Sequence, residues 1–321
     1  MMLRSKTNAT MNPKENYLAA IQFQSPDYVP MGYEPIWHTV QFEGNFKIGT
    51  WTDAWGVHWE AGLADTVPFP KGNPLPDPDR LADYRFPDPN ALRFTPEMRD
   101  ALRQVDRSRK LVMGNLTYLL FERAWALMGM ENFMAALVTH PAEMRHLLRG
   151  IADYARRVFD RYLEVGVDAI GFSEDLGSQR ALMISPAMFR AFLLPEYSYI
   201  FENALRAGKI VHFHSCGRVQ DIAADLASIG VTVLNPIQAR ANDLARLKAD
   251  TFGRTALAGG IDTALLATGT PEQVRAEVKR VMDILKPGGG YVCQPDQGLP
   301  GIPEENMRAL WETATATGRY R

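Results

Sequence analysis

The chain has 321 residues, with 35 Lys and Arg against 37 Asp and Glu, and it has two cysteines. Its formal net charge of −2 leaves no basic excess to neutralise a phosphate backbone, which argues against nucleic acid as a partner. Hydrophobic residues make up 46% of the chain, enough for a sizeable core, so wholesale disorder is excluded. Two cysteines cannot build a disulfide framework, which indicates a reducing compartment.

The amino terminus shows no targeting signal. Its first 15 residues are basic and polar, and no apolar stretch follows them. No run in the chain approaches the roughly 18 consecutive apolar residues that a bilayer-spanning helix needs. We therefore expect a soluble, cytoplasmic protein that does not contact a membrane, with residues 1–13 disordered.

Short apolar segments alternate with helical patterns along most of the chain. The first segment contains Pro30, which indicates an edge or an irregular start because proline cannot donate to a strand ladder. The later segments are continuously apolar, as is typical of strands buried on both faces of a parallel sheet. Strands are therefore predicted at residues 28–32, 110–114, 168–172, 209–213, 231–234, 255–258 and 290–293.

Start and stop signals delimit the helices between these strands. Thr270 is a cap residue, Pro271 stands at the first helical position, and Gln273 completes a capping box. Pro287 and Gly288 then end that helix. Helices are predicted at residues 141–162, 186–208, 220–229, 271–285 and 303–317.

Strand–helix alternation over this length predicts a (β/α)8 barrel, with an open doubly wound sheet as the alternative. No G-x-G-x-x-G follows the first predicted strand, which weakens a dinucleotide-binding form of the open sheet. Residues 66–91 are rich in Pro and Asp and are predicted to form an ordered surface excursion without regular structure. No long linker divides the chain later, so residues 1–321 are expected to form one domain.

The two cysteines stand at predicted strand ends, where parallel α/β folds hold their reactive groups. His214 and Cys216 follow one strand, and Cys293 ends another, with 76 residues between the cysteines. In an H-x-C sequence on an extended segment, both side chains point the same way. One imidazole and two thiolates make three of the four ligands of tetrahedral zinc and leave an open position. The alternative is that both cysteines are small buried residues of the core.

Polar residues at the other strand ends complete the candidate site. Glu174 and Asp175 can orient substrate, or one can be a fourth zinc ligand; a salt bridge or a helix cap is the alternative. His212 is expected to lie deeper, as a core or supporting residue. The candidate catalytic residues are Glu174, Asp175 and Gln179. The candidate substrate-binding residues are Asn115, Asn235, Gln238, Asp262 and Gln297. Helix capping is the alternative for Gln179, Asn235 and Gln238, and above all for Asp262.

Several motifs in order resemble one family over residues 14–318. H-x-C followed some seventy residues later by Cys is similar to the zinc signature of the methylcobalamin:thiol methyltransferases, which belong to the uroporphyrinogen decarboxylase superfamily. The resemblance implies a barrel of that type with an N-terminal extension, in which His214, Cys216 and Cys293 hold zinc. Its other segments are Asp53-Ala-Trp-Gly56, Asp175-Leu-Gly-Ser-Gln179, Val233-Leu-Asn-Pro-Ile-Gln238, Gly259-Gly-Ile-Asp262, Gly288-Gly-Gly-Tyr291 and Pro303-Glu-Glu-Asn306.

Two departures from the superfamily pattern bear on the substrate. The true decarboxylases have an arginine-rich porphyrinogen pocket that opens after the first strand, where this chain has Met31-Gly-Tyr-Glu-Pro-Ile-Trp37. Without those arginines an acidic tetrapyrrole loses its anchors, so a decarboxylase-like lyase is only the second alternative. Many relatives have a His where this chain has Gln297, and a neutral amide there leaves the substrate class open.

The resemblance implies a zinc-dependent methyltransferase that moves a methyl group between a corrinoid and a small substrate. Zinc deprotonates a bound thiol at neutral pH, which makes a thiol the expected substrate. The chain has no D-x-H-x-x-G cobalamin segment, so a separate corrinoid-binding protein would supply the corrinoid. The first alternative is an O- or N-demethylase component that passes methyl to a corrinoid protein. A further alternative is a non-enzymatic scaffold. The chain can also form a homo-oligomer in any of these cases.

Overall fold

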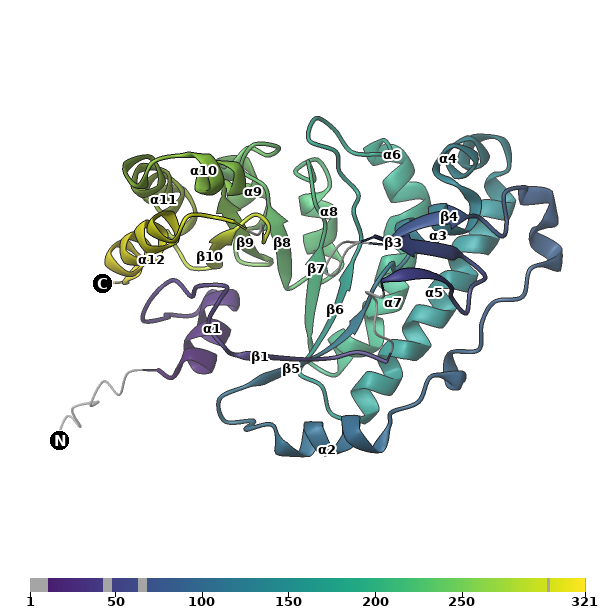
Figure 1. Cartoon of the computed structure of the whole chain (residues 1–321), viewed down its shortest axis with the longest axis horizontal. Helices are drawn as coiled ribbons and strands as arrows, with labels where there is room; N and C mark the ends of the chain where they lie inside the picture. The colour runs from purple at the N-terminus through teal and green to yellow at the C-terminus, as the bar shows by residue number, and fades with distance from the viewer. Residues whose placement is uncertain (1–10, 43–47, 63–67, 299–300, 321) are drawn as a thin grey trace.

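The computed structural model describes residues 11–42, 48–62, 68–298 and 301–320. Seven parallel strands form one curled sheet in the order β1-β5-β6-β7-β8-β9-β10, with helices on its outer side (Figure 1). The strands are β1 (Trp37–Val40), β5 (Leu111–Leu116), β6 (Ala169–Ser173), β7 (Ile210–His214), β8 (Val233–Ile237), β9 (Ala256–Ile261) and β10 (Tyr291–Pro295).

The predicted strands from residue 110 onward are confirmed, with shifts of a few residues at their ends. The predicted first strand at 28–32 is wrong. Tyr28 and Met31 make only isolated bridges, and β1 begins at Trp37. Pro30 lacks an amide hydrogen, so it can only accept, and its carbonyl takes the N–H of Cys293 at 2.9 Å.

The segment before β1 bears on whether the sheet closes. Met31 forms a parallel bridge with Cys293 of β10, while β1 pairs with β5. The sheet therefore curls back toward its own first strand. The described residues give seven strands in this sheet, so the fold is a curled parallel α/β sheet, the coarser form of the predicted eight-stranded barrel.

All five predicted helices are present. The capping box of α11 forms as expected, with the Thr270 side chain accepting from the N–H of Gln273. The helices of the described residues are α1 (Pro13–Ile21), α2 (Pro96–Gln104), α3 (Phe121–Met128), α4 (Met130–Thr139), α5 (Pro141–Glu164), α6 (Pro186–Met188), α7 (Leu194–Arg206), α8 (Ala223–Ser228), α9 (Leu244–Thr251), α10 (Thr263–Thr268), α11 (Pro271–Leu285) and α12 (Glu304–Gly318).

The predicted helix 186–208 is split into α6, a π-helical turn at Phe189–Leu193, and α7. Pro195 has no N–H, so the carbonyl of Ala191 loses the partner that a regular helix would give it. Arg145 of α5 donates to that carbonyl instead, at 2.7 Å. The proline thus explains both the irregular turn and the contact between the two helices.

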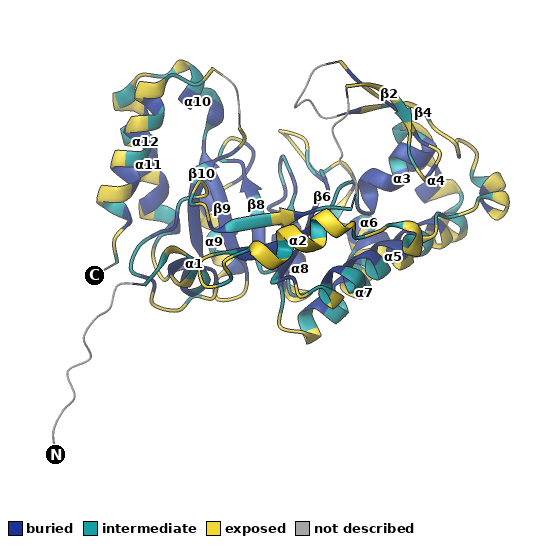
Figure 2. Ribbon diagram, turned by 60° about the horizontal axis from the view of Figure 1, so that its bottom comes forward, coloured by how far each residue is buried: buried dark blue, intermediate teal, exposed yellow. Residues whose placement is uncertain are grey.

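Two hydrophobic cores lie on the two faces of the curled sheet. The larger core fills the space between the sheet and the outer helices. In Figure 2 the outer helices carry dark-blue, buried residues, whereas α2 carries none. The smaller core takes side chains from nearly every strand together with Tyr17 and Ile21 of α1. Only the concave face of a curled sheet can bring together one side chain from so many strands, so this second core lies inside the curl.

A second sheet precedes the main α/β region. Its antiparallel strands are β2 (Gly49–Thr52), β3 (His58–Ala61) and β4 (Phe69–Gly72). The expectation of no regular structure in residues 66–91 is therefore wrong for the described part, which holds β4 and 3₁₀ turns at Pro78–Asp83 and Pro89–Ala91. Pro70 is tolerated because β4 pairs on one side only. Residues 66 and 67 lie outside the described residues.

The amino-terminal expectation also needs correction. Asn12 caps α1 in a capping box with Glu15, and the N–H of Met11 donates to Asp27 at 2.8 Å. Residues 11–13 are therefore ordered rather than disordered. Residues 1–10 lie outside the described residues.

Asp296 ties the ends of three strands together and yields a prediction about stability. Its two carboxylate oxygens accept from Gly260 N–H at 2.8 Å and from Ala239 N–H at 3.2 Å. Burial raises the pKa of Asp296 from its ordinary value of 3.8 to about 7. Between those values the folded chain keeps a proton that the unfolded chain releases, so this group's contribution to stability falls as pH rises through that window.

We expect Asp296→Asn to remove that pH-dependent term. Urea unfolding of wild type and variant at pH 5 and at pH 8 measures it, since the loss of stability between the two pH values should be smaller in the variant. The variant should be less stable at both pH values by about 1–3 kcal/mol, because one backbone N–H loses its acceptor. An equal or larger loss in the variant would contradict the assignment.

Candidate metal centre

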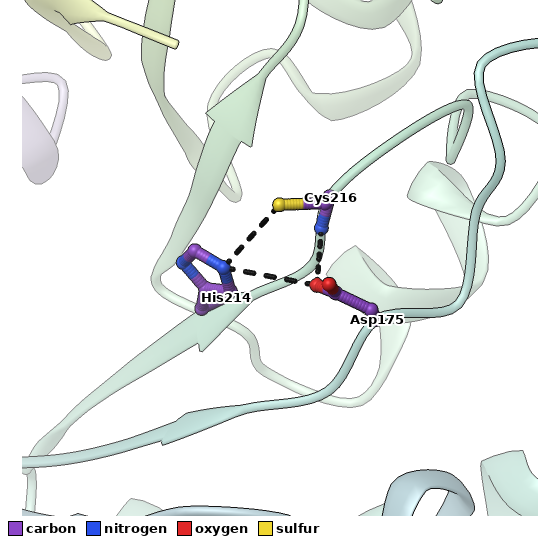
Figure 3. Close-up of side chains that lie close together, drawn as sticks. All are labelled: Asp175, His214 and Cys216. Carbon is purple, nitrogen blue, oxygen red and sulfur yellow. Dashed lines mark hydrogen bonds and ion pairs between the residues drawn. The ribbon is translucent and has the colours of Figure 1, made fainter. Parts of the chain in front are cut away.

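Three potential metal ligands meet at the carboxyl ends of β6 and β7 (Figure 3). His214 ends β7, Cys216 lies two residues later, and Asp175 follows β6. The Sγ of Cys216 is 3.6 Å from Nε2 of His214, which is 3.7 Å from Oδ1 of Asp175. One donor atom from each residue lies within 4.8 Å of the others.

These distances fit a tetrahedral zinc ion. Zn–N bonds of about 2.05 Å and Zn–S bonds of about 2.3 Å, meeting at the tetrahedral angle, place nitrogen and sulfur about 3.6 Å apart. The observed separation of Cys216 Sγ and His214 Nε2 is 3.6 Å. The imidazole, thiol and carboxylate are also donor types that zinc accepts. The three side chains can therefore hold zinc without large rearrangement.

Asn235 supports the imidazole from behind. Its Oδ1 lies 3.2 Å from Nδ1 of His214. An amide oxygen can only accept, so Nδ1 carries the proton and Nε2 keeps its lone pair facing the cluster. Sequence reasoning had Asn235 as a substrate-binding candidate; the structure gives it this orienting contact.

Two glycines bring Asp175 and Cys216 together. A Cβ on Gly177 would collide with the backbone of Cys216 and Arg218, and a Cβ on Gly217 would collide with Gly177. Gly217 also has φ +81°, a conformation that favours glycine. The loops after β6 and β7 therefore cross in backbone contact, which allows Oδ1 of Asp175 to accept from Cys216 N–H at 2.8 Å.

Gln179 and Gln238 hold the loop that carries Cys216. Gln179 Nε2 donates to Gln238 Oε1 at 2.7 Å, and the same oxygen accepts from Gly217 N–H at 3.0 Å. Asn242, which sequence reasoning missed, accepts from Val219 N–H at 2.9 Å. The structure thus places Gln238 in contact with the loop and Gln179 against Gln238, and neither is in the ligand cluster.

The thiol of Cys216 is half-buried beside a carboxylate. Burial and then the charge of Asp175 raise the pKa of Cys216 to about 12. Without a metal, the side chain is therefore a neutral thiol at pH 7. Gln297 Nε2 lies 3.1 Å from Sγ and can donate to the sulfur, which favours the thiolate. Gln297 is therefore part of the cluster.

Cys293 does not join the cluster, contrary to the prediction that it is a metal ligand. It is 2% exposed and belongs to the larger core, whereas its neighbour Val292 belongs to the core inside the curl. Successive residues of a strand point to opposite faces of the sheet. The Cys293 thiol therefore points toward the outer helices, and burial raises its pKa to about 12. This matches the alternative of a buried core cysteine.

The adjacent carboxylates Glu174 and Asp175 separate into different environments. Glu174 is fully buried, and its carboxylate accepts from the N–H groups of Leu120, at 2.9 Å, and Phe121 at the start of α3. Tyr197 also donates to it, at 2.8 Å. Burial raises the pKa of Glu174 to about 7. Glu174 thus caps a helix, the alternative considered for it, although the helix is α3 rather than the one that follows it.

Asp262 and Asn115 lie outside the ligand cluster. Asp262 caps α10 by accepting from Ala264 N–H at 2.9 Å, as expected, and forms an ion pair with Arg240. Asn115 lines a separate cavity of about 300 Å³ beside the second sheet. The cavity wall includes the pair Asp53 and Arg123, whose oxygen and nitrogen are 2.5 Å apart.

Sequence reasoning missed the buried charges of α3. Arg123 stacks on Trp55, with 5.0 Å to the ring centre. Glu122 is 8% exposed, and burial, together with the charges of Glu174 and Asp175, raises its pKa well above the ordinary value. Both residues lie in an apolar helical pattern, so the only sequence signal for buried charge was this pair of charged residues inside the pattern.

This fold and cluster define a class of protein: a curled parallel α/β protein with potential metal ligands at the ends of adjacent strands. The uroporphyrinogen decarboxylase (URO-D) family matches residues 45–317, so the chain belongs to that family. Proteins named uroporphyrinogen decarboxylase in Aromatoleum aromaticum and Gloeobacter violaceus are 24% and 26% identical over 262 and 257 residues. The matches cover 75% of this chain and 68% and 69% of those relatives.

A solved methyltransferase structure from Methanosarcina mazei has a similar fold. The TM-score is 0.73, and the match covers 95% of this chain and 99% of that one at 19% identity. Such low identity shows the fold alone. Among the described residues, no helix is both long enough and apolar enough to cross a membrane.

We expect the two cysteines to differ in zinc binding. Wild type should bind about one Zn²⁺ per chain, Cys216→Ala should bind it at least about tenfold more weakly, and Cys293→Ala should bind as wild type. Competition with a chromophoric chelator and elemental analysis measure this. Cys293→Ala is the matched control, because it makes the same substitution on the other face of the sheet. Equal losses in both variants would return Cys293 to the ligand set.

Proposed function

We propose that this protein is a zinc-dependent methyltransferase that moves a methyl group between a corrinoid, carried by a partner protein, and a small thiol. The observation that carries the proposal is the cluster of Asp175, His214 and Cys216, whose spacing fits tetrahedral zinc. Membership of the uroporphyrinogen decarboxylase family and the fold shared with a methyltransferase are consistent with it.

The donor set gives the site its chemical character. The carboxylate of Asp175 and the thiolate of Cys216 together carry two negative charges, which balance the charge of Zn²⁺. Bound zinc would lower the pKa of a substrate thiol, so that a thiolate is available at neutral pH. The protein's own residues then act by position: Asn235 orients His214, and Gln297 donates to the Cys216 sulfur.

The decarboxylase alternative finds less support in the residues near the site. The relatives are named decarboxylases. The segment where the decarboxylases would place their arginines supplies Met31 and Trp37 to a cavity in this chain. An acidic tetrapyrrole would meet no guanidinium among the described residues that line that cavity.

The donor set also favours a second candidate, the O- or N-demethylase component. Cys216 is the one sulfur of the cluster, since Cys293 faces the outer helices. A shell with fewer thiolates leaves zinc a stronger Lewis acid, which suits activation of a methyl ether or amine. The two candidates share the metal site and differ in the substrate and the direction of transfer.

The test of function follows the corrinoid spectrum. Zinc-loaded protein is mixed anaerobically with methylcobalamin and a thiol, and transfer gives the methyl thioether, cob(I)alamin and a proton. We expect thiol-dependent loss of the methylcobalamin absorbance, abolished in Cys216→Ala and retained in Cys293→Ala. Methylation of cob(I)alamin by methyl ethers or amines, without transfer to thiols, would favour the demethylase. Carbon dioxide release from uroporphyrinogen would overturn both.

Substitution of Asn235 tests the support of the imidazole. Asn235→Ala removes the acceptor for His214 Nδ1, so we expect zinc affinity to fall about 10–100-fold. Asn235→Asp keeps an oxygen acceptor and should stay closer to wild type. Chelator competition at pH 7.5 measures both variants. An equal loss in the two variants would mean that the acceptor is not what Asn235 contributes.

A further inference from the structure

We propose that a cavity inside the curl of the sheet receives an uncharged small molecule. The cavity has a volume of about 260 Å³. This inference rests on the proposed function, because the molecule it describes is the small substrate of the methyl transfer. It names the chemical class of that substrate, which neither the family nor the relatives determine.

The cavity adjoins the ligand cluster. Asn235 lines it and also contacts Nδ1 of His214 at 3.2 Å. His212, two residues before His214 on the same face of β7, lines it as well. A molecule seated here therefore lies one side chain away from the imidazole that faces the cluster.

Apolar and neutral polar groups share the walls about equally. Met31, Trp37, Met113 and Val292 come from three separate segments of the chain and face the same space. The polar groups are two neutral amides and the hydroxyls of Tyr17 and Thr39, together with the His212 ring, which packs edge-on against Trp37 with 6.2 Å between ring centres. None of the described lining residues is Asp, Glu, Lys or Arg.

This lining discriminates by charge. A carboxylate or sulfonate placed here would lose its hydration and find no cation, a loss that costs several kcal/mol for an unpaired charge. An ammonium would likewise find no carboxylate. A neutral thiol or thioether loses little hydration and gains contact with the apolar walls. The volume of about 260 Å³, just below the range of ligand pockets, also limits the occupant to a small molecule.

The guanidinium in the wall of the neighbouring cavity, beside the second sheet, is already held in an ion pair. This guanidinium, of Arg123, is 2.5 Å from Asp53 and packed against Trp55. An anionic substrate would have to displace a buried ion pair, which is costly. Of the two cavities, the uncharged one is also the one whose wall touches His214.

A matched pair of thioethers tests the inference: methyl propyl sulfide, and 3-(methylthio)propionate, which has the same chain length and a carboxylate. Neither needs a metal, so the titration is carried out on metal-free full-length protein and followed by ligand-detected NMR. We expect the neutral probe to bind at least about tenfold more tightly. Equal or tighter binding of the carboxylate, or no binding of either probe, would overturn the inference.

Two variants locate the binding. Ala258→Phe fills the cavity and should abolish binding of the neutral probe, while Ala135→Phe on the exposed face of α4 is the matched control and should bind as wild type. Thr39→Arg adds a cation at an exposed position of the cavity wall. It should raise affinity for the carboxylate probe about tenfold. An unchanged carboxylate affinity would place the binding elsewhere.

The outcomes separate this inference from the proposed function. Neutral-probe binding in metal-free protein, without zinc uptake or methyl transfer, would end the proposed function and leave the charge preference of the cavity standing. Zinc uptake and methyl transfer to anionic thiols, with no preference between the probes, would support the proposed function and overturn the charge preference of the cavity.

Discussion

The alternation of side chains along parallel strands decides which groups of this protein can meet. In β7 and β10 every second residue points into the curl and the others point toward the outer helices. His214 falls on the concave face, in contact with Asn235 of the next strand. Cys293 falls on the convex face, beside Val292 on the concave one. A shift of one residue in register would exchange these environments, so the composition of the site depends on register as much as on which residues are present.

The second constraint is the close crossing of the loops after β6 and β7. Gly177 and Gly217 remove the atoms that would keep the backbones apart, and the loops then share hydrogen bonds. This crossing gives the two neighbouring carboxylates different roles. Asp175 turns toward Cys216, while Glu174 turns into the core and satisfies the start of α3. A buried carboxylate with several backbone donors fixes the position of that helix, and the half-buried one remains available as a ligand.

The sequence was sufficient for the order and type of the main elements, because continuous apolar strands and helix caps such as Thr270 are local signals. It was also sufficient for His214 and Cys216, since a spacing of two on one extended segment sets their relative direction. It was insufficient for Cys293, because the face of the sheet on which a residue lies depends on where its strand starts in the sheet. It missed the ordered second sheet and Arg123, because cross-strand pairing and buried ion pairs link residues far apart in the chain. Prolines in residues 66–91 suggested irregular structure, but an edge strand tolerates Pro70.

The observed cluster lacks Cys293, so its donor set differs from the predicted one, but the two sets carry the same charge. A carboxylate replaces the second thiolate, so the protein still contributes two negative charges. The site can therefore still balance Zn²⁺, but carboxylate oxygen donates less electron density than thiolate sulfur, which leaves the metal more acidic. A more acidic metal binds a thiolate more tightly and makes it a weaker nucleophile. In the proposed function the uncharged cavity beside His214 would act the other way, because a thiolate that has lost its hydration is more reactive than one in water. If the protein has the proposed function, the donor set and the uncharged cavity would thus act in opposite directions on one nucleophile, and their balance would set its reactivity.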